Sequence, residues 1–160
     1  MGARVTHNPF MARAIQLAIE NVQAGKGGPF AAVVVRQGSI IAAGVNLVTS
    51  TNDPTAHAEI VAIRQACRIL SSFQLSGCEI YASSEPCPMC MGAIYWARLA
   101  RVFCAATRQD AAAAGFDDAH ISEQLQRPVS RRIIPMRQMM REEALAAFQA
   151  WDQRPDKIRY

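Results

Sequence analysis

At the centre of this sequence stand two short motifs, His57-Ala58-Glu59 and, thirty residues after its histidine, Pro86-Cys87-Pro88-Met89-Cys90. Each motif opens a predicted helix in an alternation of elements: helices over residues 55–70 and 87–98, and strands over 78–83 and 101–106. This alternation favours a largely parallel sheet with helices on its faces. Connection handedness then places the beginnings of both helices at the carboxyl edge of the strands, where ligands usually bind.

The segments before this alternation are also patterned. Apolar residues recur at helical spacing from Met11 to Val22, with Asn8-Pro9 as a start and Gly25 as a stop. Two β-branched segments, 30–35 and 40–48, enclose the turn 36–39 and predict an antiparallel hairpin, which a polar loop over 49–54 follows.

Beyond residue 106 the patterns predict short helices over 110–114 and 119–126, a strand over 133–139, a helix over 141–153 and an extended tail over 154–160. Pro135 weakens that strand or confines it to a sheet edge. The expected fold is therefore α/β, a three-layer α/β/α sandwich whose central mixed sheet has about five strands.

Composition sets the broad class. The chain has 160 residues, 51% hydrophobic and 19% charged, so we expect a single domain over 1–160 with its own core. Neither a membrane span nor a secretory signal is visible, which predicts a cytoplasmic protein with no membrane partner. The net charge of +4 raises nucleic acid as a partner.

Five cysteines, an odd number, include one pair at CxxC spacing, which favours metal or redox chemistry over a disulfide framework. Cys87 and Cys90 are three apart, so both thiolates point to one side of the first helical turn, and His57 can add a neutral nitrogen. Three protein ligands leave the fourth position of one tetrahedral Zn²⁺ per chain to water or hydroxide, as in a catalytic site. We expect the remaining cysteines to belong to the core: Cys67, Cys78 and Cys104.

Glu59 lies two residues from His57, which is about 200° around a helix, so the two side chains should not ligate the same face of the ion. Beside a zinc-bound water, Glu59 can take a proton and pass it to a substrate nitrogen. A CxxC pair alone would also suit a zinc ribbon or a redox site. A redox pair, however, does not explain His57 or Glu59. A zinc-stabilised binding module without catalysis stays as the alternative outside the enzymes.

HxE followed by PCxxC is the signature of the zinc-dependent nucleobase deaminases, which this chain resembles from its first predicted helix to about Gln153. Within that cytidine/deoxycytidylate deaminase superfamily, it is similar to the small bacterial guanine deaminases. The likeness is carried by residues 27–33, 52–59, 85–97, 114–118 (Ala-Gly-Phe-Asp-Asp) and 148–151, and by the terminal Tyr160. The resemblance implies a cytidine deaminase-like fold and hydrolysis of guanine to xanthine and ammonia in purine catabolism or salvage, with aminated rings such as triazines as side substrates.

The resemblance also implies roles for single residues. Glu59 relays a proton to a ring nitrogen, and Asp118 is a second carboxylate that helps the leaving group, with Glu123 as the reserve candidate. The implied substrate contacts are stacking by Phe30, recognition of the base edge by Asn46, a contact from the Ala58 backbone amide, and closure of the pocket by Trp96 and Tyr160. In this family Tyr160 comes from the partner of a homodimer that exchanges its C-terminal segment, so residues 154–160 are expected to cap the active site.

Two other deaminases share HxE and PCxxC and stay as alternatives. A tRNA adenosine deaminase needs a basic path for phosphates. Here lysine is scarce and the arginines gather only at Arg127, Arg131 and Arg132, so a small purine base is favoured over nucleic acid as the partner. A cytosine or cytidine deaminase is the third candidate.

Overall fold

The computed structural model describes residues 7–160. Contacts group the chain into two compact units, of which the first ends at Asp118 and the second runs over Ala119–Tyr160. Each unit is described by itself, and the single domain expected over the whole chain stays a prediction.

The first unit is built on one mixed sheet of four strands in the order β2-β1-β3-β4: β1 (Ala31–Arg36), β2 (Ser39–Val45), β3 (Cys78–Ser84) and β4 (Arg101–Ala106). The hairpin of β1 and β2 is antiparallel, as predicted, and β1 is also antiparallel to β3. Only β3 and β4 pair in parallel, so the expectation of a largely parallel sheet is wrong. The reason is that the first hairpin supplies half of the strands.

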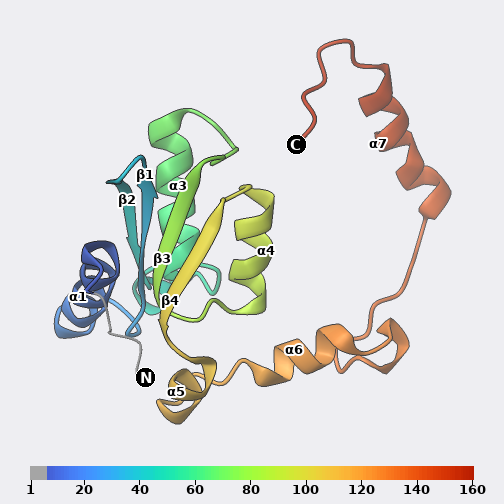
Figure 1. The fold of residues 1–160 in the computed structure, drawn as a ribbon. Helices are drawn as coiled ribbons and strands as arrows, with labels where there is room; N and C mark the ends of the chain where they lie inside the picture. Colours follow the sequence, from blue (N-terminus) through green and yellow to red (C-terminus); the bar gives the residue numbers. More distant parts are fainter. Residues whose placement is uncertain (1–6) are drawn as a thin grey trace, which may run out of the picture. The chain divides into compact units, whose positions relative to one another are not determined.

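Helices cover both faces of this sheet, which confirms the three-layer architecture (Figure 1). Helix α1 (Pro9–Gln23) starts at Asn8, whose side chain accepts hydrogen bonds from two backbone amides, and it packs on β1 and β3. Helices α3 (Ala58–Leu70) and α4 (Pro88–Trp96) pack on the opposite face, and α3 lies against β2. A Cβ on Gly44 would lie 2.2 Å from the Ala58 carbonyl oxygen, so glycine permits this close approach of α3 to the sheet.

The strand ends bring the candidate site residues together at one edge of the sheet. Strands β2, β3 and β4 run in the same direction, and β1 runs opposite to them. Asn46, Glu85 and Thr107 directly follow the three, and Phe30 precedes β1, so all four residues lie at one edge of the sheet. Helices α3 and α4 begin at this edge, as the sequence predicts.

Two connections are more helical than expected. The last residue of the predicted strand 40–48 and the first part of the predicted polar loop 49–54 form one short helix, α2 (Val48–Thr51). Helix α5 (Arg108–Ala113) begins two residues before the predicted start, because Thr107 and Asp110 form a capping box.

The second unit contains α6 (Ala119–Gln126), the short 3-10 helix η1 (Val129–Arg131) and α7 (Arg141–Gln153). The strand predicted over 133–139 is absent from this unit, so the sheet has four strands where the sequence predicts about five. The segment 133–139 is exposed and pairs with no strand, and Pro135 cannot donate a hydrogen bond to a neighbouring strand. Among residues 7–160, no helix is long and apolar enough to cross a bilayer.

Candidate metal centre and active-site cavity

Three metal-ligating side chains meet at the edge where α3 and α4 begin. His57 and Cys87 are the N-cap residues of the two helices, and Cys90 lies in the first turn of α4. The His57 Nδ1 atom is 3.6 Å from Cys87 Sγ and 3.5 Å from Cys90 Sγ, and all three ligand atoms lie within 4.8 Å of one another. Zinc bonds of about 2.0 Å to nitrogen and 2.3 Å to sulfur at tetrahedral angles require an N···S distance of about 3.5 Å. The three residues therefore fit a tetrahedral zinc ion.

The electrostatics of this trio also suit a dication. A hydrogen bond from the Cys90 thiol lowers the pKa of Cys87 to about 4, which favours the thiolate form of Cys87. The same hydrogen bond, together with burial, raises the pKa of Cys90, which favours a proton on the buried sulfur. A divalent cation would replace that proton and balance two thiolates, and the two helix N-termini contribute positive potential at the same point.

The other three cysteines lie in two kinds of surroundings, the hydrophobic core and the surface. Cys67 and Cys78 belong to or pack against the hydrophobic core between the sheet and α3, as predicted. Cys104 is exposed on β4, so its assignment to the core is wrong. The physical reason is that β4 is an edge strand, on which Phe103 is also exposed.

Glu59 lies in the first turn of α3 and is only 8% exposed. It lines the same cavity as His57 and Cys87, but it is not one of the three clustered ligands. Burial raises the pKa of its carboxyl group, which favours a group that can both accept and return a proton. The structure thus brings Glu59 beside the metal ligands without making it one of them.

A cavity of about 360 Å³ opens onto the metal ligands, which is the size of a small-molecule site. Phe30 and Asn46 line it, as the sequence analysis expects of substrate contacts. Phe116 packs edge-on against Phe30, with ring centroids 4.9 Å apart, and also lines the cavity. The cavity therefore has an aromatic wall made by Phe30 and Phe116, which suits a flat ring.

Asn46 is buried and its side chain has a defined orientation. Its Oδ1 atom accepts hydrogen bonds from the backbone amides of Gly28 and Val48, both at 3.3 Å. Two backbone donors on one side identify that atom as the oxygen, so the amide nitrogen is the group left for a ligand.

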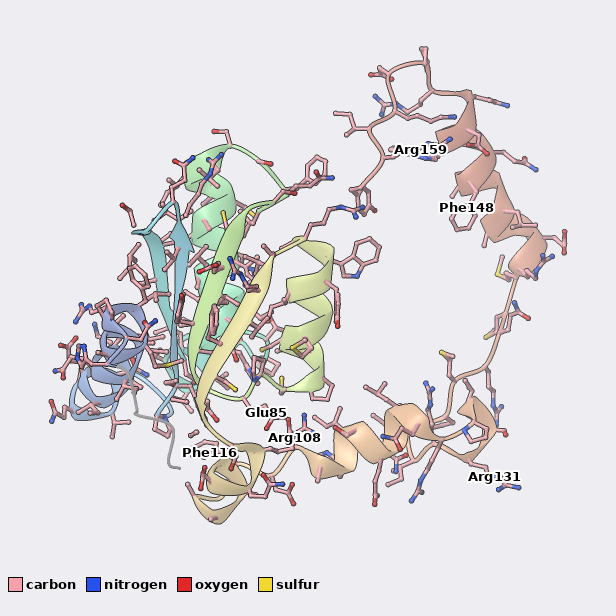
Figure 2. The ribbon with its side chains drawn as sticks, in the orientation of Figure 1. Glu85, Arg108, Phe116, Arg131, Phe148 and Arg159 are labelled. Atoms are coloured by element: carbon pink, nitrogen blue, oxygen red, sulfur yellow. The ribbon has the colours of Figure 1, made fainter. Side chains whose placement is uncertain are left out.

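The sequence analysis did not name several of the lining residues as site residues, and Glu85, Arg108 and Phe116 are among them. Figure 2 shows all three near the point where β4 leads into α5. Arg108 donates its backbone amide to Glu85 at 3.1 Å, and its Nε atom lies 3.3 Å from Asp118 Oδ1. The signal that could have found Glu85 and Arg108 is their position just after two neighbouring parallel strands.

The remaining candidates lie in different surroundings. Asp118 lines the cavity, paired with Arg108. Glu123 belongs to the second unit, where its 69% exposed side chain pairs with Arg127 at 3.7 Å. Ala58 is buried at the start of α3, and Trp96, at the end of α4, is 68% exposed. Tyr160 belongs to the second unit and is 71% exposed.

Comparison with known proteins agrees with this site. Residues 4–106 match the family described as the cytidine and deoxycytidylate deaminase zinc-binding region. Guanine deaminase of Bacillus subtilis is 53% identical over 156 residues, which cover 98% of this chain and 100% of that protein. The X-ray structure of that guanine deaminase superposes with a TM-score of 0.94 over 98% of this chain and 99% of its own.

A second kind of relative matches less of the chain. The tRNA-specific adenosine deaminase of Aquifex aeolicus is 46% identical over 74 residues, which are 46% of this chain and 49% of that protein. A zinc-compatible trio at two helix N-termini, a buried glutamate beside it and the match over residues 4–106 lead to one conclusion: the chain belongs to the family of zinc-binding cytidine and deoxycytidylate deaminases.

Proposed function

We propose that this chain is a zinc-dependent aminohydrolase that converts guanine to xanthine and ammonia. The observation that carries the proposal is the 53% identity to a guanine deaminase over the whole length of both chains. The family motifs alone do not separate guanine from other bases. The extent of the match favours guanine, because the match to guanine deaminase covers 98% of this chain and that to the tRNA-specific adenosine deaminase of Aquifex aeolicus covers 46%.

The reaction replaces a carbon–nitrogen bond by a carbon–oxygen bond. A zinc ion held by His57, Cys87 and Cys90 would supply Lewis acidity that makes a nearby water molecule more acidic. Glu59 is placed to accept a proton from the attacking water as the water oxygen bonds to the amino-bearing ring carbon, and to return that proton to the adjacent ring nitrogen. The second proton of the same water is transferred to the amino group as the carbon–nitrogen bond breaks, the new carbon–oxygen bond becomes a carbonyl, and ammonia leaves.

The second proton transfer belongs to Asp118 in this proposal. Its carboxylate lines the cavity that holds Glu59, and the Arg108 guanidinium fixes it at 3.3 Å. Glu123, the reserve candidate, is paired with Arg127 on an exposed helix face. Asp118 is therefore favoured for the departing amine.

The rest of the cavity orients the base. Phe30 stacks on the ring, and the amide nitrogen of Asn46 donates to an acceptor on the base edge, since its oxygen is held by two backbone amides. The backbone amide of Ala58 is a further contact. Related aminated rings, including triazines, are expected as side substrates because such a cavity selects flat, hydrogen-bonding rings.

The C-terminal segment completes the proposal. Every described residue from 119 to 160 is at least partly exposed, although the segment carries large apolar side chains such as Phe148 and Trp151. Unburied apolar surface of this kind is typical of a segment that packs on another chain. We therefore propose a homodimer with exchanged C-terminal segments, in which Tyr160 of one chain and Trp96 of the other close the pocket.

We also propose a cytoplasmic protein in purine catabolism or salvage. None of the five cysteines, all of which lie within residues 7–160, forms a disulfide, which suits a reducing compartment.

The test is substrate-resolved ammonia release. Purified protein is incubated with guanine, adenine, cytosine, cytidine or a tRNA anticodon stem-loop, and Glu59→Gln serves as the inactive control. We expect ammonia from guanine only, with xanthine formed in equal amount. Activity confined to the stem-loop would instead identify a tRNA adenosine deaminase, and release from cytosine or cytidine would identify the third candidate.

A further inference from the structure

Helix α1 contains one buried polar side chain with no place in the chemistry above. Asn21 is 2% exposed, in a helix whose other buried residues are Ala14 and Ala18. Its Nδ2 atom donates two hydrogen bonds of 2.9 Å, to the carbonyl oxygens of Gly28 and Asn46. A buried amide is costly unless it makes such bonds, and the helical pattern would have been satisfied by an apolar residue.

The two carbonyls come from different segments of the cavity wall. Gly28 belongs to the loop before β1, and Asn46 directly follows β2. Both residues line the cavity, whereas Asn21 does not. The same two segments touch at Gly27, where a Cβ would lie 2.2 Å from the Asn46 carbonyl oxygen. The loop and the end of β2 are thus held together by the two hydrogen bonds of the Asn21 side chain and by the direct contact between Gly27 and Asn46.

This arrangement controls Asn46. The Asn46 backbone amide donates to Phe30 at 3.0 Å, its carbonyl oxygen accepts from Asn21, and its Oδ1 accepts from Gly28 and Val48. If the loop moved, the Gly28 amide would no longer hold Oδ1, and the side-chain amide could rotate. Only while Oδ1 is held does the amide nitrogen face a ligand with its two donors.

We propose that Asn21 is a positioning residue for base recognition: it fixes the backbones of Gly28 and Asn46 so that the Asn46 amide nitrogen donates to the acceptors on a purine edge. Guanine offers O6 and N7 as acceptors, so this donor sets which base is bound. The inference rests on the proposed function and adds to it a residue that never touches the substrate. The effect belongs to binding, so it appears in KM more than in kcat.

The variants Asn21→Leu and Asn21→Asp test this. Leucine removes both donors at similar volume, and aspartate keeps the shape but turns an oxygen toward two carbonyls. We expect KM for guanine to rise about tenfold with kcat within about threefold, the pattern of lost binding energy. The matched control is Leu17→Ala on the same helix, which packs against the cluster of Ala14, Val33, Val35 and Tyr81 and should lower thermal stability without changing KM.

A double-mutant cycle with Asn46→Leu separates positioning from general loosening of the fold. If Asn21 acts through Asn46, adding Asn21→Leu to Asn46→Leu raises KM no further. Independent, multiplying effects would overturn the inference. If the leucine variant does not fold, the cycle is run with Asn21→Asp.

A measurement that does not depend on turnover tests the positioning role of Asn21 separately from the proposed guanine deaminase activity. In ¹⁵N–¹H spectra of the isotopically labelled protein, the Asn46 side-chain amide signals should shift or broaden in both Asn21 variants and stay unchanged in Leu17→Ala. Unmoved signals would overturn the positioning role. Absence of wild-type activity on guanine would overturn only the proposed substrate, and the same cycle would then be measured with whichever base releases ammonia.

Discussion

The two units of this chain hold their polar side chains in opposite ways. In the first unit, the metal ligands and Glu59 lie at the beginnings of two helices, and Asn46 and Asp118 line the same cavity. In the second unit, every residue from 119 to 160 is at least partly exposed, including the candidate residues Glu123 and Tyr160.

The difference shows what positions a functional group. A helix N-terminus or a strand end fixes a side chain through the backbone of its own unit, so the site of the first unit is assembled within one chain. A side chain on an exposed segment gains a defined position only from a surface outside that segment. The proposed chemistry therefore depends on the first unit, and the proposed closure of the pocket depends on what the second unit packs against.

The largest effect should follow loss of a metal ligand. Cys90→Ser replaces a buried thiol by a poorer zinc ligand, so the purified variant should lose both its bound zinc and its activity. The control is Cys104→Ser, on the exposed edge strand, which should keep both. Zinc per chain is measured by plasma mass spectrometry. Full zinc content in Cys90→Ser would show that the trio is not the metal centre.

The second largest loss of activity should follow the substitution Glu59→Gln. The amide keeps the shape of a side chain that is 8% exposed but cannot carry a proton, so kcat should fall by about 10²–10⁴-fold. Zinc content should stay at the wild-type level, which separates this variant from Cys90→Ser. A loss of zinc together with activity would instead make Glu59 a part of the metal centre.

The same contrast explains how far the sequence could predict this molecule. His57, Cys87 and Cys90 could be assigned because their spacing alone puts them at two helix N-termini. Cys104 could not, because strand order, and hence which strand lies at an edge, is a tertiary property that its apolar neighbours do not encode.

The segment 133–139 and Asn21 show the limit of local patterns. The strand predicted over 133–139 failed because β-branched residues favour a strand only where a partner strand is present. Asn21 was missed as a functional residue because nothing local distinguishes a helical asparagine that faces water from one that bonds to two distant carbonyls. The assignment to guanine rests on similarity to guanine deaminases over nearly the whole chain, including residues beyond 106. Composition and motif spacing alone could not have led to it.

Asp118→Asn is expected to have a smaller effect than Glu59→Gln. It removes the proposed proton carrier for the departing amine but can keep a contact with Arg108, so kcat should fall by about 10²-fold with little change in KM. Glu123→Gln is its counterpart in the second unit and should leave kcat unchanged. The reverse outcome would move the second proton transfer to the exposed segment.

The smallest effect, and the one that bears most directly on the second unit, should come from deleting residues 154–160. If Tyr160 closes the pocket of the partner chain, its removal costs one aromatic contact with the base, about 1 kcal/mol, which corresponds to about a fivefold rise in KM. Zinc content should not change, because all three ligands lie in the first unit. Mixing this truncation with the full-length variant Glu59→Gln then tests the exchange: only if tails cross between chains does a heterodimer combine an intact active site with an intact tail. Recovery of the wild-type KM in the mixture would place Tyr160 in the partner's pocket, whereas a KM that stays at the truncated value would confine the tail to its own chain.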